Sequence, residues 1–153
     1  MKSWNDFSIE EPELARIGKD LLFRSEVGLA FLATLRKDGA PRLHPVSLTF
    51  SSGRLYLLIP PASPKCADLI RDGRYAMQAF PSQNEANDEF YLTGRAACIQ
   101  DPALRNAVIC ETHIRAGEDE ILFELFVERV MHTRLVNCGT PDEHPVHGIW
   151  RAT

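Results

Sequence analysis

The residues in this chain best suited to chemistry are a serine and a lysine at an expected helix start. Ser63, Pro64 and Lys65 follow a proline-rich turn, and serine followed by proline is typical of an N-cap and a first helical position. The free amides and the dipole of a helix N-terminus favour an anion there. A lysine in the first turn opposes the dipole unless an anion binds nearby, so we expect a phosphate site, although a solvated surface lysine also fits the spacing.

A second candidate ligand for the same anion is Arg42, at the start of an expected strand. Its guanidinium can bind a phosphate through two parallel hydrogen bonds, whereas a lysine acts as a point charge. The next strand of the hairpin leads directly into Ser63, so Arg42 could reach the group bound at Lys65. The alternative is an exposed arginine at a strand end.

The elements that must position these residues are mostly strands. Apolar, β-rich segments separated by turns such as Asp38-Gly39 and Ser52-Gly53 predict strands over residues 27–35, 43–50, 55–59, 75–80, 90–99, 122–135 and 146–150. Gly94, inside one of them, predicts a bulge. Helices are expected over about residues 9–24, after a capping box that starts at Ser8, and over residues 65–71 and 102–112.

This pattern predicts a mainly β (α+β) fold with a closed or partly closed antiparallel barrel of six or seven strands and a few short peripheral helices, because closure removes exposed strand edges. Residues 1–153 are expected to form a single domain. A barrel this small is filled by its own side chains. A large ligand should therefore lie outside it, in a groove that a second subunit completes.

Composition limits the function classes. The formal net charge of −4 disfavours general nucleic-acid binding, which needs many cations. No apolar run approaches the ~20 residues that span a bilayer, and the N-terminus does not look like a signal peptide. The four cysteines form no CxxC pair, which favours a cytoplasmic protein without a disulfide framework. Cys138, His144 and His147 match no standard zinc spacing, so no metal site is expected.

Several segments, in this order, resemble the pyridoxamine 5′-phosphate oxidase-like group of FMN-binding split barrels. They are residues 40–46 (APRLHPV), 53–57 (GRLYL), 63–69 (SPKCADL), 72–76 (DGRYA), 90–96 (FYLTGRA) and 123–127 (FELFV). The resemblance covers about residues 27–137. It implies a six-stranded split barrel that forms a homodimer with two FMN molecules at the subunit interface.

The resemblance also implies which residues hold the cofactor. Three side chains would contact the phosphate, and the backbone of two strand segments would run along the flavin ring. A further residue would contact the cofactor of the other subunit. In this chain these positions are Arg42, Ser63 and Lys65 for the phosphate, His44, Pro45, Val46, Leu58 and Ile59 along the ring, and Glu89 across the interface.

The chain departs from the enzymes that produce pyridoxal phosphate. Pro64 replaces an arginine between the serine and the lysine, and Trp150-Arg151 lacks the surrounding C-terminal pattern. We therefore expect an FMN-dependent oxidoreductase that acts on another small molecule, with the flavin supplying the redox chemistry and no dedicated nucleophile or catalytic triad. His44 could hydrogen-bond the flavin or serve only the strand. The alternatives are a flavin- or haem-binding protein without turnover and an F420-dependent reductase.

Overall fold

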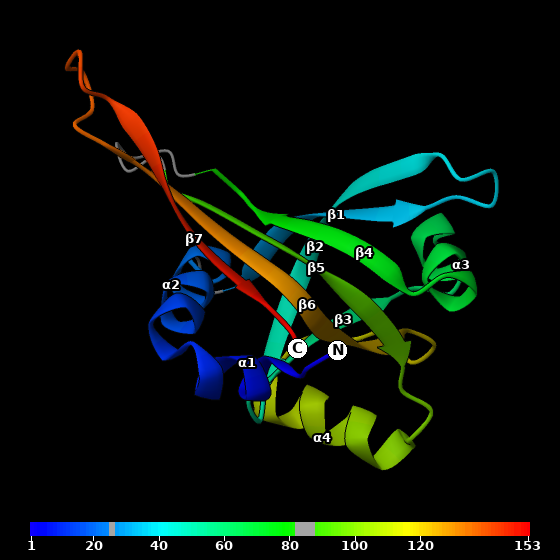
Figure 1. Ribbon diagram of the computed structural model, residues 1–153. Helices are drawn as coiled ribbons and strands as arrows, with labels where there is room; N and C mark the ends of the chain where they lie inside the picture. The colour runs from blue at the N-terminus through cyan, green and yellow to red at the C-terminus, as the bar shows by residue number, and fades with distance from the viewer. Residues whose placement is uncertain (25–26, 82–87) are drawn as a thin grey trace.

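The computed structural model describes residues 1–24, 27–81 and 88–153, and these form seven strands and four helices. The strands are β1 (Gly28–Leu35), β2 (Pro41–Ser51), β3 (Arg54–Ile59), β4 (Arg74–Ala79), β5 (Glu89–Cys98), β6 (Ile121–Val136) and β7 (His144–Arg151). Their order is β3-β2-β1-β4-β5-β6-β7, and β3 also pairs with β6, which closes six strands into an antiparallel barrel (Figure 1). β7 lies outside that ring, on β6. The predicted mainly β barrel is therefore confirmed.

The turns and the bulge form where the sequence predicts them. Gly39 and Gly53 have positive φ angles of 83° and 75° in the two hairpin turns, a conformation that favours glycine. At Gly94 the register between β5 and β6 shifts. A Cβ atom there would lie 1.8 Å from the carbonyl oxygen of Phe126, so only glycine allows the strands this close.

The N-terminal helix is the main correction to the predicted elements. Instead of one helix over about residues 9–24, the chain forms α1 (Trp4–Glu10) and α2 (Pro12–Leu22). The capping box is made by Ser3 and Asp6, not by a box starting at Ser8. Pro12 has no amide hydrogen to continue α1, and the backbone of Glu11 leaves the helical region, so the helix breaks between the two segments.

Side chains fill the barrel interior. β1 alternates strictly between buried and half-buried residues, and Leu32, Met77, Leu92 and Leu125 are among the fully buried side chains of the core. Trp4 and Phe7 of α1 belong to this core, and their two rings meet edge to face with centroids 5.4 Å apart. These side chains occupy the interior of the described barrel, so a ligand outside it remains the expectation.

The site is positioned by the place where β2 and β3 separate. The two strands pair only from Thr49 and Tyr56 to the turn between them. Beyond that point β2 continues along β1, whereas β3 continues along β6. The barrel is therefore split on this side. Two helices stand near the opening: α3 (Pro64–Arg71), which directly follows β3, and α4 (Pro102–Thr112), which packs on β2.

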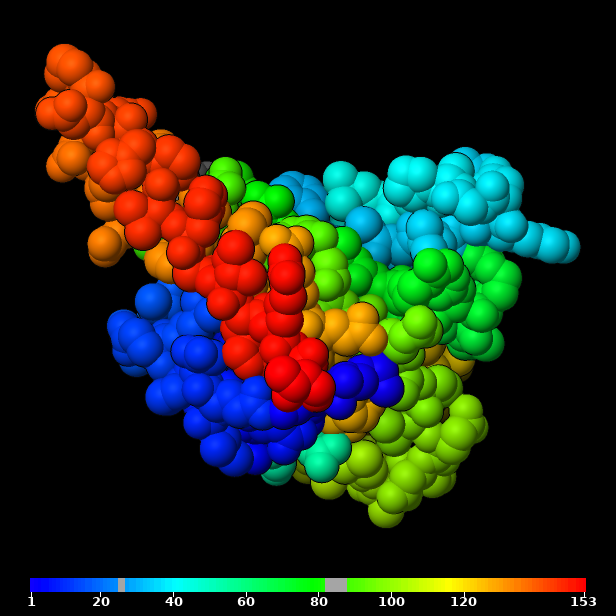
Figure 2. All heavy atoms as spheres, viewed as in Figure 1, coloured from blue at the N-terminus to red at the C-terminus, as the bar shows by residue number. Residues whose placement is uncertain are grey.

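The β6–β7 hairpin extends well beyond the barrel as an arm (Figures 1 and 2). Most of β7 is exposed, whereas Trp150 near its end is buried and donates a hydrogen bond to Glu10 of α1. All four cysteines are free thiols. None of the helices described here is long and apolar enough to span a bilayer.

Candidate functional site

A large hollow lies where β2 and β3 part. It has a volume of about 620 Å³ and is lined by residues 45–49, 57–60 and 112–115 with Val27, Lys65 and Glu120. We call it the main groove. Among the described strands β2 has no partner on this side beyond Thr49, so the backbone along residues 45–48 presents an edge to the groove that no described strand pairs with. Such an edge offers both amide donors and carbonyl acceptors to a flat polar ring.

Five of the nine sequence-predicted residues line this groove. Pro45 and Val46 come from β2, Leu58 and Ile59 from β3, and Lys65 from the first turn of α3. They come together because β3 leads into α3 through only four residues, which keeps Lys65 at the end of the strand it follows. Apolar side chains of β2 and β3 share the lining with polar ones, and its charged residues are Lys65, Arg115 and Glu120.

At the start of α3 the backbone has the predicted N-cap and first turn, but the predicted capping hydrogen bond is not formed. Ser63 occupies the N-cap position and Pro64 the first turn, yet the Ser63 side chain makes no capping hydrogen bond. Instead, Nζ of Lys65 donates to Oγ of Ser63 at 3.1 Å. Lys65 is half-buried and forms no ion pair with any carboxylate in the described part of the chain. Pro64 has no amide hydrogen, and the amide of Cys66 donates to the carbonyl of Ser63 at 2.9 Å. The ammonium and the backbone amide of Lys65 thus keep capacity for an anion.

His44 lies on β2 next to these cations. Its Nε2 atom is buried and has no hydrogen-bond partner among the described residues. Burial lowers the pKa of this imidazole, and the nearby charges of Lys65 and Arg42 lower it further. His44 is therefore neutral at pH 7, and its unpaired nitrogen is shielded by the surrounding residues. His44 itself does not line the main groove.

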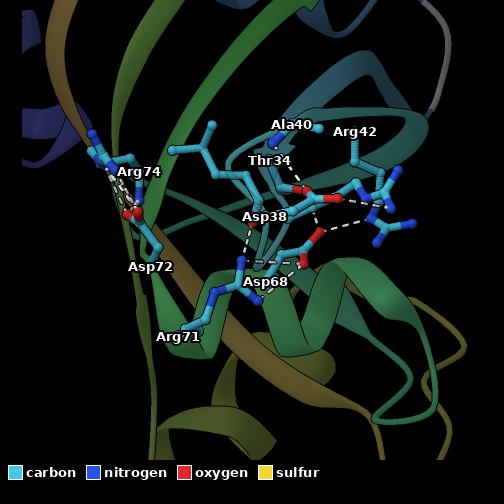
Figure 3. A network of polar contacts seen from close by, with 10 residues as sticks. Thr34, Asp38, Ala40, Arg42, Asp68, Arg71, Asp72 and Arg74 are labelled. Carbon is cyan, nitrogen blue, oxygen red and sulfur yellow. Dashed lines mark hydrogen bonds and ion pairs between the residues drawn. The ribbon is translucent and has the colours of Figure 1, made fainter.

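Arg42 is held away from the groove by a carboxylate that the sequence analysis did not single out. Nε of Arg42 donates to Asp68 of α3 at 2.7 Å, and the hydroxyl of Thr34 donates to the same carboxylate oxygen at 2.9 Å. Arg71 approaches the other oxygen at 3.3 Å (Figure 3). Burial opposes ionisation of Asp68, but the hydrogen bonds from Arg42 and Thr34 outweigh it and lower its pKa.

Glu89 lies far along the sheet from this corner. It is exposed at the start of β5, paired with Thr133 of β6, and does not line the main groove. Within one protomer the structure therefore brings together the β2, β3 and α3 residues but not Glu89. A cofactor contact from Glu89 requires a second subunit.

Sequence reasoning missed one wall of the groove. This wall is formed by Thr112, the last residue of α4, and by residues 113–115 after it, which line the groove together with β2, β3 and Glu120. His113 ends the helix in the left-handed conformation, with φ of 53°, which turns the chain toward the groove. The segment has no periodic pattern, so only its position after α4 could have indicated it. The described residues hold no cluster of three or more side chains suited to a metal ion.

Solved structures of similar fold include proteins that bind different cofactors. A heme-binding protein from Mycobacterium smegmatis is 19% identical, with a TM-score of 0.59 over 84% of this chain and 56% of that one. The heme storage protein HutZ from Vibrio cholerae is 16% identical, with a TM-score of 0.58 over 77% and 89% of the two chains. An F420 reductase is 16% identical, with a TM-score of 0.55 over 72% and 94%. At these identities the likeness establishes the fold alone.

The comparison with curated proteins gives no match. The family model described as pyridoxamine 5′-phosphate oxidase matches residues 21–143, which contain the main groove and the corner at Lys65. That match spans most of the chain and agrees with the barrel topology. The chain therefore belongs to the pyridoxamine 5′-phosphate oxidase family.

Proposed function

We propose that the protein binds FMN in the main groove and is an oxidoreductase acting on a small molecule. The observation that carries this proposal is a groove of mixed apolar and polar lining that joins an unpaired β2 edge to a lysine with no carboxylate partner in the described residues. A volume of about 620 Å³ is in the range of small-molecule sites. The phosphate would bind at the Ser63 hydroxyl and at the ammonium and backbone amide of Lys65.

The protein's own residues would bind and orient the ring. The β2 edge around Pro45 and Val46 would supply backbone hydrogen bonds, while Leu58 and Ile59 would supply apolar contact. His44, neutral at pH 7, would contact the phosphate end only after its ring turns to bring the buried Nε2 atom into the groove. The flavin, once bound, supplies hydride or electron transfer, and the protein tunes and shields it.

We further propose that the active form is a homodimer. The outer face of β1, β4 and β5 carries an apolar hollow of about 330 Å³, with Leu43 at its rim 66% exposed. Phe31 and Phe80 stack there with centroids 4.3 Å apart. α1, α2 and α4 lie on the other side of the barrel (Figure 1). A second copy covering this face would bury the apolar patch and could bring Glu89 to the partner's groove.

The dimer is tested by light scattering on the purified protein at micromolar concentration. We expect twice the chain mass of 17.2 kDa, and we expect Leu43→Glu to shift the protein toward one chain mass because it places a charge in the proposed interface. A wild-type protein of single-chain mass would contradict the dimer.

The cofactor and the turnover are tested together by spectroscopy. The protein reconstituted with FMN should show flavin absorption after gel filtration, lose it when NADH or NADPH is added without oxygen, and regain it with an electron acceptor. Bound flavin that no reductant changes would refute the oxidoreductase and leave a flavin carrier. An F420 spectrum in the purified protein would replace FMN in the proposal.

A second candidate is haem binding. His113 lies at the rim of the main groove, exposed and next to Arg115, and imidazole is a common axial ligand of haem iron. Two structures of the same fold are described as a heme-binding and a heme storage protein. A Soret band that disappears in His113→Ala would support haem, whereas unchanged haem binding in that variant would remove the observation that favours it.

A further inference from the structure

A second hollow lies on the other side of the start of α3 from the main groove. Its volume is about 430 Å³. One wall is the face of α3 that carries Pro64, Ala67, Asp68 and Arg71, which the helical period places in a row. The other wall is the β1–β2 turn, from residue 36 to residue 38, together with Arg42. We call this the basic hollow.

The basic hollow carries a local excess of positive charge in an otherwise acidic chain. Four cations line it, Arg36, Lys37, Arg42 and Arg71, against the carboxylates of Asp38 and Asp68. Four positive and two negative charges leave an excess of two. The chain as a whole has a formal net charge of −4, so the positive charge of the hollow is local and does not reflect the composition of the chain.

The carboxylates in the hollow organise the cations rather than neutralise them all. Asp68, whose side chain is only 4% exposed, holds Arg42 through Nε and Arg71 through Nη1 (Figure 3). The two Nη atoms of Arg42 have no hydrogen-bond partner among the described residues. When Asp68 holds the guanidinium of Arg42 at Nε, the N–H donors of the two Nη atoms are already fixed in position. This lowers the entropic cost of binding an anion there.

Lys37 adds a free charge at the mouth of the hollow. It is exposed in the β1–β2 turn, next to Arg36, which pairs with Asp38 at 3.2 Å. Within the described ranges Lys37 makes no hydrogen bond or ion pair. Lys37 and the Nη atoms of Arg42 thus supply the charge that the carboxylates do not balance.

We propose that the basic hollow is a second anion-binding site that takes a diphosphate-type polyanion, separate from the phosphate proposed at Lys65. A charge excess of two and donors on both walls suit two linked phosphates better than one. The inference is independent of the flavin, because none of the cations in the hollow lines the main groove. The diphosphate could come from two chemical sources. It could belong to a separate molecule, or to one end of a longer ligand that lies in the main groove and extends past Pro64 into the basic hollow.

The test is calorimetric titration of the full chain with inorganic pyrophosphate at low ionic strength. We expect Lys37→Glu to weaken pyrophosphate binding by about tenfold or more, because an attractive charge becomes a repulsive one. Arg134→Gln, which removes an exposed cation on the β6–β7 arm that makes no described contact, should bind like the wild type. Lys65→Ala should also retain pyrophosphate binding. Equal binding by the wild type and Lys37→Glu, or loss of binding in Lys65→Ala alone, would overturn the proposal.

A second titration distinguishes the two sources. If the diphosphate belongs to a ligand in the groove, FAD should bind the wild type more tightly than FMN, and Lys37→Glu should remove that advantage. If it belongs to a second molecule, FMN and FAD should bind alike and pyrophosphate should still bind with FMN present. A chain that binds pyrophosphate through Lys37 but binds no flavin would refute the proposed function and leave the basic hollow as an anion site.

Discussion

Asp68→Asn tests the buried carboxylate that fixes the corner between β1, β2 and α3. The carboxylate accepts hydrogen bonds from Thr34, Arg42 and Arg71 while only 4% of the side chain is exposed. Hydrogen bonds to a charged group contribute about 1.5–3 kcal/mol each, but Arg42 and Arg71 are 29% and 37% exposed and regain water once released. With that discount we expect a loss of about 2–3 kcal/mol in the free energy of unfolding.

The assay is urea denaturation followed by tryptophan fluorescence and circular dichroism. Asp119→Asn is the matched control, because Asp119 lies exposed in the loop before β6 and makes no described ion pair. The control should unfold like the wild type. An Asp68→Asn variant within about 0.5 kcal/mol of the wild type would refute the view that this carboxylate holds the two arginines in place.

The same variant makes a pH prediction with a definite sign. The pKa of Asp68 is lowered in the folded protein, so its contribution is fully present above the unfolded value of about 3.9 and is lost as the pH falls through the lower folded value. The stability difference between the wild type and Asp68→Asn should therefore be constant near neutral pH and shrink in acid. A difference that grows as the pH falls toward 3 would contradict the assignment.

Two further substitutions test the packing around the sheet. Gly94→Ala would place a Cβ atom 1.8 Å from the carbonyl oxygen of Phe126, so β5 and β6 must move apart. We expect the free energy of unfolding, measured by urea denaturation, to fall by an amount near the upper end of about 1–3 kcal/mol. An unchanged midpoint would show that the bulge tolerates a side chain. Trp150→Phe removes the hydrogen bond to Glu10 but keeps a ring against Phe7, so a loss of about 1 kcal/mol is expected by the same measurement, and none if the pair is not formed in solution.

Most of the fold could be predicted because its signals are local. Turns such as Asp38-Gly39 and Ser52-Gly53 fix the hairpins through residues that tolerate positive φ, and the strand between them alternates across the sheet. The N-terminal helices were harder: the capping box predicted at Ser8 was wrong, and the first helix begins after Ser3. Trp4 and Phe7, which follow Ser3, are buried in the core, a tertiary contact that no local pattern encodes.

The candidate site was predictable in its residue types but not in its pairings. The strand-to-helix junction identified Lys65 as a cation at a helix start, and the structure adds that it reaches Ser63 instead of a carboxylate. That Arg42 would be held by Asp68 depends on contacts 26 residues apart in the chain, which no local pattern encodes. The wall at residues 112–115 was missed for the same reason, because its place beside β2 follows from how α4 packs.

The central claim is that the corner at Lys65 binds the phosphate of a flavin. FMN titration of the apoprotein, followed by flavin fluorescence, tests it directly in the wild type and in Lys65→Ala. The control is Lys19→Ala, which alters a lysine of α2 that lies over the ring of Phe50. Loss of one charge-assisted hydrogen bond, about 1.5–3 kcal/mol, predicts FMN binding about ten- to a hundredfold weaker in Lys65→Ala, with Lys19→Ala unchanged. Equal FMN affinity in all three proteins would contradict the account.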